Sequence, residues 1–349
     1  MKKSIIAFCL TALVAGSAQA GNPDRAGSAG ASQLLINPWA RNAALANSGM
    51  SSVRGIESTF ANVAGLAFVN NTELVFSNNQ YLVGTGISIN SLGFGKRLGE
   101  GGGVLGISVN HMKLGDLAIT ETALPEGGIG SFSPVFTNIG VSYAKSFSKS
   151  IYGGITVRLI SEAIYNVRAQ GVAFDAGIRY VTGPEDRLRF GISLRNVGPP
   201  MRYRGDGLSQ DATVSTGSGN STTLNMDMRS EKFELPAMVN VGFAYDFFLN
   251  EKSKLTANAQ FTSNSYTRDQ FAVGAEYALN QRFFLRAGYQ YETNVSDSEL
   301  RTTVFTGPAA GFTVQLPAGK NGSMIGFDYG YRLTNPFGGV HSMGVHVDI

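Results

Sequence analysis

The stretch from Gln170 to Asn196, QGVAFDAGIRYVTGPEDRLRFGISLRN, decides the fold class of this chain. It holds two runs of strict alternation on either side of the polar turn GPEDR. Apolar side chains occupy every second position, and small or charged side chains lie between them. A period of two places successive side chains on opposite faces of a strand. The stretch therefore predicts a β-hairpin with one apolar face and one charged face.

An amphipathic hairpin fits two classes of β-protein. In a soluble sandwich the apolar face forms the core, whereas in an outer-membrane barrel it contacts lipid and the polar face lines the lumen. Composition favours the barrel, because charged residues make up only 15% of the chain, against about 25% in a typical soluble domain. The 44 glycines and the 10% of aromatic residues point the same way. No run of about 18 apolar residues follows the N-terminal twenty, so no transmembrane helix is expected.

The first twenty residues, MKKSIIAFCLTALVAGSAQA, have the pattern of a secretory signal peptide. Lys2 and Lys3 precede an apolar run that ends at Ala18-Gln19-Ala20, so cleavage is expected after Ala20. Cys9, the only cysteine, is lost with this peptide, which leaves no thiol for a disulfide or a lipid anchor. Loss of Lys2 and Lys3 also reduces the formal net charge from +3 to +1. No strong basic field remains, so nucleic acid is not an expected partner.

Alternating runs of about ten residues, the length of a tilted membrane strand, recur from Thr72 to the end of the chain. We count fourteen, an even number as a closed antiparallel barrel requires. Short turns alternate with the long connections 114–134, 198–229 and 293–308, and the second of these is expected to be an irregular exposed loop. Within the second strand the apolar phase slips, which predicts a bulge near Ser91. Residues 33–68 show no alternation and are expected to form short, sheltered helices and turns.

Charged side chains recur on the phase opposite the apolar positions. An Arg or Lys at the bilayer midplane on the lipid face would cost about 2–4 kcal/mol, so these residues are predicted to face the lumen. The mixed signs favour ion pairs that hold the wall and an inward-folded N-terminal segment together, with a selective channel or ligand site as the alternative. The set comprises Arg158, Asp175, Arg179, Arg189, Arg195, Glu276, Arg286, Glu292, Asp328, Arg332 and Asp348.

The sequence offers little for catalysis. The three histidines, His111, His341 and His346, do not have metal-ligand spacing. The chain has no G-x-S-x-G motif, and the glycine-rich segment 99–103 lacks the Lys of a phosphate loop. We therefore predict no catalytic residue, no bound cofactor and no metal site.

Three stretches resemble the PorV/PorQ family of outer-membrane proteins. They are TFANVAGLAF (59–68), GVAFDAGIRY (171–180) and LRFGISLRNVGPPMRY (188–203). The first is similar to the N-P-A-G-L segment shared with FadL-type transporters, with Val63 where proline is usual. The resemblance implies a non-enzymatic, FadL-like barrel over residues 69–349, with residues 21–68 folded into or under its lumen. It also implies a role in type IX secretion, with binding of exported proteins or of translocon and attachment-complex partners.

Three functions stay open at this point. The first is the secretion-associated barrel, in which the long loops bind partner proteins and Pro199, Pro200, Met201 and Tyr203 are candidate contact residues. The second is a FadL-like transporter of hydrophobic small molecules, which needs an apolar lumen pocket that residues 34–45 could line. The third is a soluble periplasmic sandwich or solenoid. The first two place the protein in the outer membrane of a Gram-negative bacterium, in contact with lipid.

Overall fold

The computed structural model describes residues 25, 27–99, 101–216, 220–295, 297, 301–318 and 322–349. The predicted signal peptide over residues 1–20 lies outside these described residues. No helix in the described part of the chain is long and apolar enough to cross a membrane.

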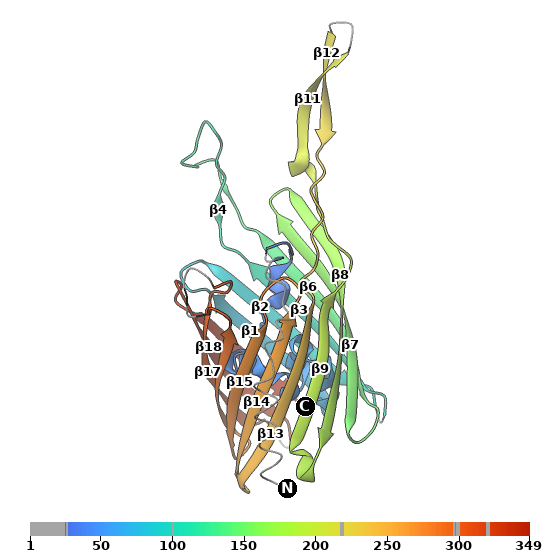
Figure 1. The fold of residues 1–349 in the computed structure, drawn as a ribbon, viewed down its shortest axis with the longest axis vertical. Coiled ribbons are helices and arrows are strands. Elements are labelled where there is room, and N and C mark those ends of the chain that lie inside the picture. The colour runs from blue at the N-terminus through green and yellow to red at the C-terminus, as the bar shows by residue number, and fades with distance from the viewer. Residues whose placement is uncertain are drawn as a thin grey trace.

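Fourteen antiparallel strands form a closed barrel (Figure 1). Each strand pairs with the wall strand that precedes it in the sequence, and pairing between the first and last strands, from Glu73–Asp348 to Gln80–His341, closes the wall. The prediction of an all-β, fourteen-stranded antiparallel barrel is confirmed. The wall strands are β1 (Thr72–Tyr81), β2 (Ile87–Arg97), β3 (Val104–Lys113), β6 (Val135–Ser146), β7 (Ile151–Ile164), β8 (Val167–Thr182), β9 (Leu188–Val197), β13 (Met238–Asn250), β14 (Ser253–Asn264), β15 (Gln270–Leu279), β16 (Phe283–Glu292), β17 (Phe305–Pro317), β18 (Met324–Thr334) and β19 (Val340–Asp348).

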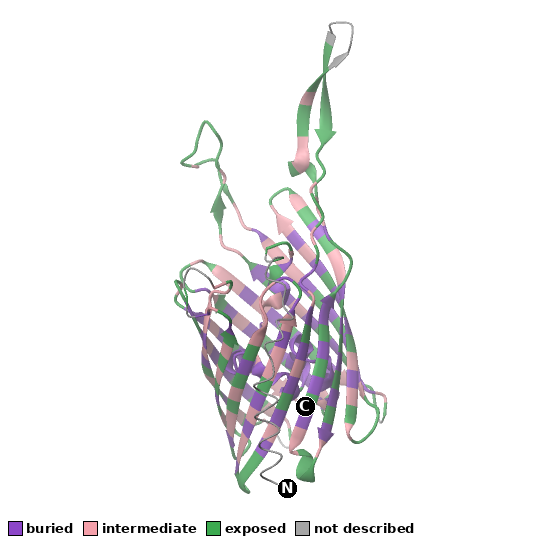
Figure 2. Cartoon of the chain, in the orientation of Figure 1, coloured by how far each residue is buried: buried purple, intermediate pink, exposed green. Residues whose placement is uncertain are grey.

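The outer face of the wall is apolar. Buried and exposed residues alternate along strands such as β3 and β8, as the bands of Figure 2 show. The exposed positions carry large apolar side chains such as Phe76, Ile107, Ile155, Ile192 and Leu285. These faces do not bury one another, which contradicts the soluble sandwich. A closed wall with an outward apolar surface is suited to the hydrocarbon of an outer membrane.

The two ends of the barrel differ. Short turns such as 147–150 and 280–282 join the strands at one end, which we call the periplasmic end, following the pattern of outer-membrane barrels. At the opposite, outer end two hairpins rise above the rim (Figure 1). One pairs β4 (Leu117–Ala118) with β5 (Ser131–Phe132), and the other pairs β11 (Ser209–Thr216) with β12 (Asn220–Asp227). The connection 198–229 is thus not the irregular loop expected from its composition.

The N-terminal residues fill the middle of the lumen. We call residues 25 and 27–68 the plug. It runs as short turns η2 (Ser32–Leu35), α2 (Ala40–Ala44), η3 (Ser48–Ser51), η4 (Ile56–Phe60) and η5 (Val63–Phe68). Trp39, Ile56 and Leu66 have no exposed surface and pack against inward residues of the wall. Glycines on the inner face permit this approach, since a Cβ on Gly288 would lie 2.4 Å from the carbonyl carbon of Leu45.

The predicted bulge near Ser91 is wrong. β2 pairs without interruption with β1 and with β3 across this position. The apolar phase changes because Ile89 faces the lumen, where it is 4% exposed and lies near Phe60 and Met112. The change of apolar phase in the sequence of β2 is therefore due to an inward apolar residue that packs on the plug.

Candidate functional site

The lumen contains two cavities with the plug between them. The outer cavity has a volume of about 480 Å³ and reaches the loops between β14 and β15 and between β16 and β17. The periplasmic cavity has a volume of about 440 Å³ and reaches the short turns 251–252 and 280–282. Each is large enough for a small organic molecule.

The outer cavity is lined by apolar and carboxamide side chains together. The apolar part includes Leu35, Ile36, Met112 and Phe305. The polar part is dominated by nine carboxamides, which are Asn37, Asn42, Asn47, Asn79, Asn240, Gln260, Asn264, Gln270 and Gln290. Such a lining suits a molecule with an apolar body and a group that forms hydrogen bonds.

Two arginines that form no ion pair within the described residues also line the outer cavity. Arg332 donates from Nη2 to Gln290 Oε1 at 2.6 Å, and its guanidinium carbon lies 3.7 Å from the ring centroid of Phe305. Arg195 donates to the carbonyl of Leu34 at 3.4 Å and lies 5.4 Å from the ring of Phe60. The outer cavity thus presents positive charge beside aromatic rings.

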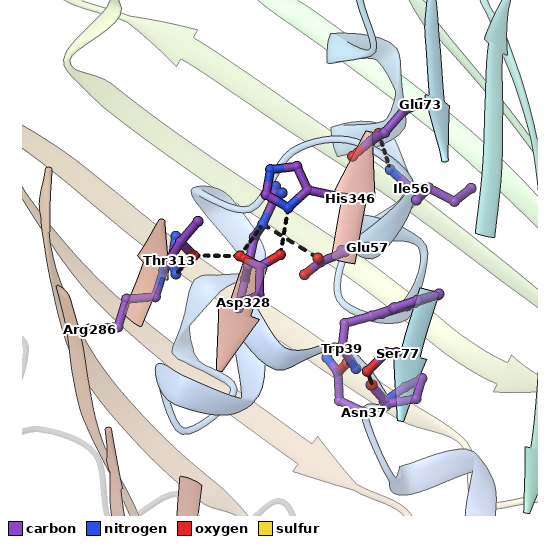
Figure 3. Close-up of polar contacts among 12 residues, drawn as sticks. Asn37, Trp39, Ile56, Glu57, Glu73, Ser77, Arg286, Thr313, Asp328 and His346 are labelled. Carbon is purple, nitrogen blue, oxygen red and sulfur yellow. Dashed lines mark hydrogen bonds and ion pairs between the residues drawn. The ribbon is translucent and has the colours of Figure 1, made fainter. Parts of the chain in front are cut away.

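A central network of buried charges ties the plug to the wall (Figure 3). Asp328 of β18 accepts from Arg41 Nε at 3.2 Å, from His346 Nδ1 at 2.6 Å and from the hydroxyl of Thr313. Arg41 Nε also lies 3.4 Å from Glu57 Oε1. Residues of α2, β17 and β19 therefore meet at the carboxylate of Asp328 on β18, and Arg41 links Glu57 of η4 to it.

The plug makes further polar contacts with β1. Glu73 Oε2 accepts the backbone N–H of Ile56 at 2.7 Å. The side chains of Ser77 and Asn79 both donate to the carbonyl of Pro38 at 2.8 Å. These bonds satisfy backbone groups that the short turns of the plug leave unpaired.

Burial sets the charge state of the central network. Burial raises the pKa of Glu57 to about 7, although the neighbouring Arg41 opposes this shift. Within the described residues its Oε2 atom is buried without a hydrogen-bond partner, so no donor stabilises the charged form at this oxygen. Burial would lower the pKa of Arg41, but Asp328 and Glu57 raise it above its ordinary value. No group of three or more metal-binding side chains occurs among the described residues.

The sequence-predicted lumen residues all belong to strands of the wall, and the structure brings several of them together. Arg158 pairs with Asp175 at 2.7 Å, and Arg286 pairs with Glu276 at 2.6 Å. Arg189 pairs with Asp246, which the predicted set lacks. Of the remaining residues, Asp328 joins the central network, and Arg179 donates to the plug carbonyls of Met50 and Val53. Glu292 accepts from Gln270 and Thr302, whereas Arg195 and Arg332 line the outer cavity. Asp348 is half-buried at the end of β19.

Sequence reasoning missed Arg41, Glu57 and Asp246. Asp246 lies between Tyr245 and Phe247, so the alternation of β13 contains the signal that places it in the lumen. Arg41 and Glu57 belong to a segment without periodicity, and no sequence signal pairs them with β18.

The candidate contact residues near the outer rim differ in their placement. Pro199 and Pro200 are exposed, but Met201 is 2% exposed and packs near Leu34 of the plug. Tyr203, in the two-residue strand β10 (Tyr203–Arg204), donates to Glu162, which also accepts from Gln33 of the plug. Met201 and Tyr203 are therefore engaged within the chain and help to hold the plug.

Comparison with known proteins gives similarity of fold alone. No family model matches the sequence, and no curated protein matches it. Among solved structures, the CymD monoaromatic hydrocarbon channel matches with a TM-score of 0.53 and 12% identity over 89% of this chain and 96% of that chain. The toluene transporter TbuX of Ralstonia pickettii matches with a TM-score of 0.52 and 16% identity over 89% and 96%. A FadL homologue of Pseudomonas aeruginosa matches with a TM-score of 0.54 and 12% identity over 90% and 98%.

The fold is that of the FadL-like outer-membrane barrels. The matches cover nearly the whole of each solved chain. At 12–16% identity the side chains of the lumen are free to differ, and the chemistry of this FadL-like barrel has to be argued from its own cavities.

Proposed function

We propose that this protein is a non-enzymatic outer-membrane channel for hydrophobic small molecules that carry a polar group. The outer cavity is the observation that supports this proposal. In about 480 Å³ it combines apolar residues, carboxamides and two arginines that form no ion pair with any described residue. The similar solved structures include a hydrocarbon channel and a toluene transporter, and the carboxamides of this chain favour a more polar ligand than those names indicate.

The wall next to the outer cavity has a local break in strand pairing. β16 and β17 pair only as far as Tyr289–Pro308, and the pairing of β17 with β18 shifts between Phe305 and Ala309. Pro308 has no N–H to donate to a neighbouring strand. Gln290 and Phe305, on the unpaired side of this break, line the outer cavity. This is where a hydrophobic ligand could pass between cavity and lipid with the least loss of backbone pairing.

Ligand binding to the purified protein in neutral detergent tests the proposal. The probes are 1-decanol, with an apolar chain and a hydroxyl, and decane, with the chain alone. We expect decanol to bind more tightly than decane, and Arg332→Gln and Gln260→Leu to weaken decanol binding. Equal binding of both probes, or no change in the two variants, would contradict a polar-group site in the outer cavity.

A second proposal follows the sequence resemblance to the PorV/PorQ family. Under it the barrel binds exported proteins or translocon and attachment-complex partners in type IX secretion. The β11–β12 hairpin supports this proposal, because Ala212 pairs with Leu224 and Gln210 with Met226, which places the apolar members on one face. Val214, Leu224 and Met226 are between 39% and 51% exposed. A free two-stranded hairpin is marginally stable in water, so a protein partner would stabilise it.

Deletion of the hairpin separates the two functions. We expect a chain that lacks residues 209–227 to keep ligand binding if the protein is a channel. If it serves secretion, the same deletion abolishes recovery of translocon or cargo proteins from detergent-solubilised outer membrane. If translocon or cargo proteins are still recovered after the deletion, the hairpin is not the surface that binds them.

A further inference from the structure

The charged side chains that line the periplasmic cavity are mainly basic. Two are acidic, Glu251 and Glu276, and six are basic, namely Arg41, Arg54, Arg189, Lys252, Lys254 and Arg286. Glu276 is already paired with Arg286 at 2.6 Å. A cavity lined by one sign of charge and walled by protein concentrates the potential within it.

Arg54 is the basic residue of this cavity that is least compensated. It lies between η3 and η4 of the plug, and its side chain is exposed to the cavity. Its guanidinium carbon lies 4.8 Å from the ring centroid of Phe68. Within the described residues it forms no ion pair and no side-chain hydrogen bond. Burial and the nearby Arg189 lower the pKa of Arg54, and Asp246 offsets this shift only in part.

Arg179 adds a second uncompensated charge behind Arg54. It is fully buried and donates from Nη2 to the carbonyls of Met50 and Val53, both at 2.7 Å. In the described part of the chain, its Nε and Nη1 atoms have no hydrogen-bond partner. Its guanidinium carbon lies 5.5 Å from the ring of Phe68, so this ring contacts both arginines.

Asp246 is the carboxylate that contacts the basic groups on this side of the cavity. Asp246 pairs with Arg189, lies 3.2 Å from Lys254 and accepts the hydroxyl of Thr256 at 2.7 Å. Among the described residues, no carboxylate forms an ion pair with Arg54 or Arg179. Removing charges from bulk water without a counter-charge is costly, and an anion in the cavity would offset that cost.

We infer that the periplasmic cavity is a binding site for a carboxylate or phosphate group, with Arg54 as its principal ligand. Arg189 and Lys254 line the same cavity and add positive charge next to Arg54. The anion could arrive as a free ion or as the headgroup of an anionic lipid, since both present the same oxygens to a guanidinium. This site goes beyond the proposed function, because it does not require that the outer cavity conducts or that a protein partner binds.

Calorimetric titration of the mature protein in a neutral detergent tests this site. The probes are inorganic phosphate and dihexanoyl phosphatidic acid, at an ionic strength of about 0.15 M so that distant charges are screened. We expect one molecule of at least one probe to bind per chain, and Arg54→Gln to weaken that binding by about tenfold through loss of one charged hydrogen bond. Arg54→Lys should retain part of the affinity, because it keeps the charge and loses the planar fork.

Arg282→Gln is the matched control. Arg282 is an exposed arginine in the turn between β15 and β16, at the same end of the barrel, and it does not line the cavity. Binding should be unchanged in this variant. Phosphate binding would identify a free anion as the ligand, and binding of the phosphatidic acid alone would identify a lipid headgroup. Absence of binding for both probes at millimolar concentration, or equal loss in Arg54→Gln and Arg282→Gln, would overturn the inference.

Discussion

At the residue scale, the buried pair of Arg158 and Asp175 allows the contribution of lumen charges to the stability of the barrel to be measured. Arg158 has no exposed surface and Asp175 is 3% exposed, so neither charge can be solvated if its partner is lost. We expect Arg158→Leu to destabilise the barrel by about 3–5 kcal/mol, because it leaves Asp175 buried and unpaired. The double variant Arg158→Leu/Asp175→Asn should recover most of this loss, since the introduced amide is uncharged and its oxygen would still accept from the N–H of Asn196. Urea unfolding of the barrel from lipid vesicles measures both values.

Glu57 makes the stability of the plug depend on pH. Its pKa is raised from 4.5 in the unfolded chain to about 7 in the folded protein, so the folded state binds more protons between these values. The contribution of Glu57 to stability is therefore fully present below pH 4.5 and is lost as the pH rises through 7. The charged groups that interact with Glu57 are Arg41, Asp328, Arg286 and Glu73, and Glu57→Gln leaves them in place.

We expect the wild-type plug to be more stable at pH 5.5 than at pH 8.5, and Glu57→Gln to reduce this difference. Trp39, the only tryptophan of the chain and fully buried in the plug, reports unfolding of the plug through its fluorescence. An equal pH dependence in both proteins would show that another group is responsible.

At the element scale, the fit of the plug depends on small residues on the inner face of the wall. A Cβ at Gly288 would lie 2.4 Å from the backbone carbonyl of Leu45, which cannot move aside as a side chain can. A Cβ at Gly344 would meet its nearest atoms at 3.5 Å, an ordinary contact. We expect Gly288→Ala to destabilise the plug by about 1–3 kcal/mol, as overpacking does, and Gly344→Ala to be tolerated. Limited proteolysis of the plug in the folded barrel measures the difference, and similar protection in both variants would contradict this account.

The elements that sequence could predict are those with a period of two. In β8 and β9 the alternation of apolar and charged residues is a local property, because each strand has lipid on one side and lumen on the other. It located the fourteen wall strands and placed Asp175 and Arg179 inside. The plug could not be predicted in this way, since Arg41 and Glu57 are positioned by Asp328, which is far away in the sequence. The alternation also misled the prediction at Ile89, because an apolar residue that faces the lumen gives the same sequence pattern as a bulge.

At the scale of the whole molecule, the plug lies between the two cavities and is bonded to β1, β8 and β18. If a ligand in the outer cavity travels through the lumen to the periplasm, the plug has to shift or leave. Exit into lipid through the break between β16 and β17 has no such requirement, and neither has a partner-binding function. The mobility of the plug therefore distinguishes passage through the lumen from both of these.

A disulfide between the plug and the wall tests this requirement. A Cβ on Gly344 of β19 would lie 3.8 Å from the Cβ of Ala40 in α2, a separation suited to a disulfide. Because the only cysteine, Cys9, lies in the predicted signal peptide, the Ala40→Cys/Gly344→Cys pair introduces the sole thiols of the mature chain. We expect the oxidised double variant to abolish uptake of labelled decanol into cells that produce the protein, and reduction to restore it. Each single cysteine variant should transport as the wild type does. Uptake that continues at the wild-type rate with the disulfide closed would show that the ligand bypasses the plug, through the break between β16 and β17 or by another route along the wall.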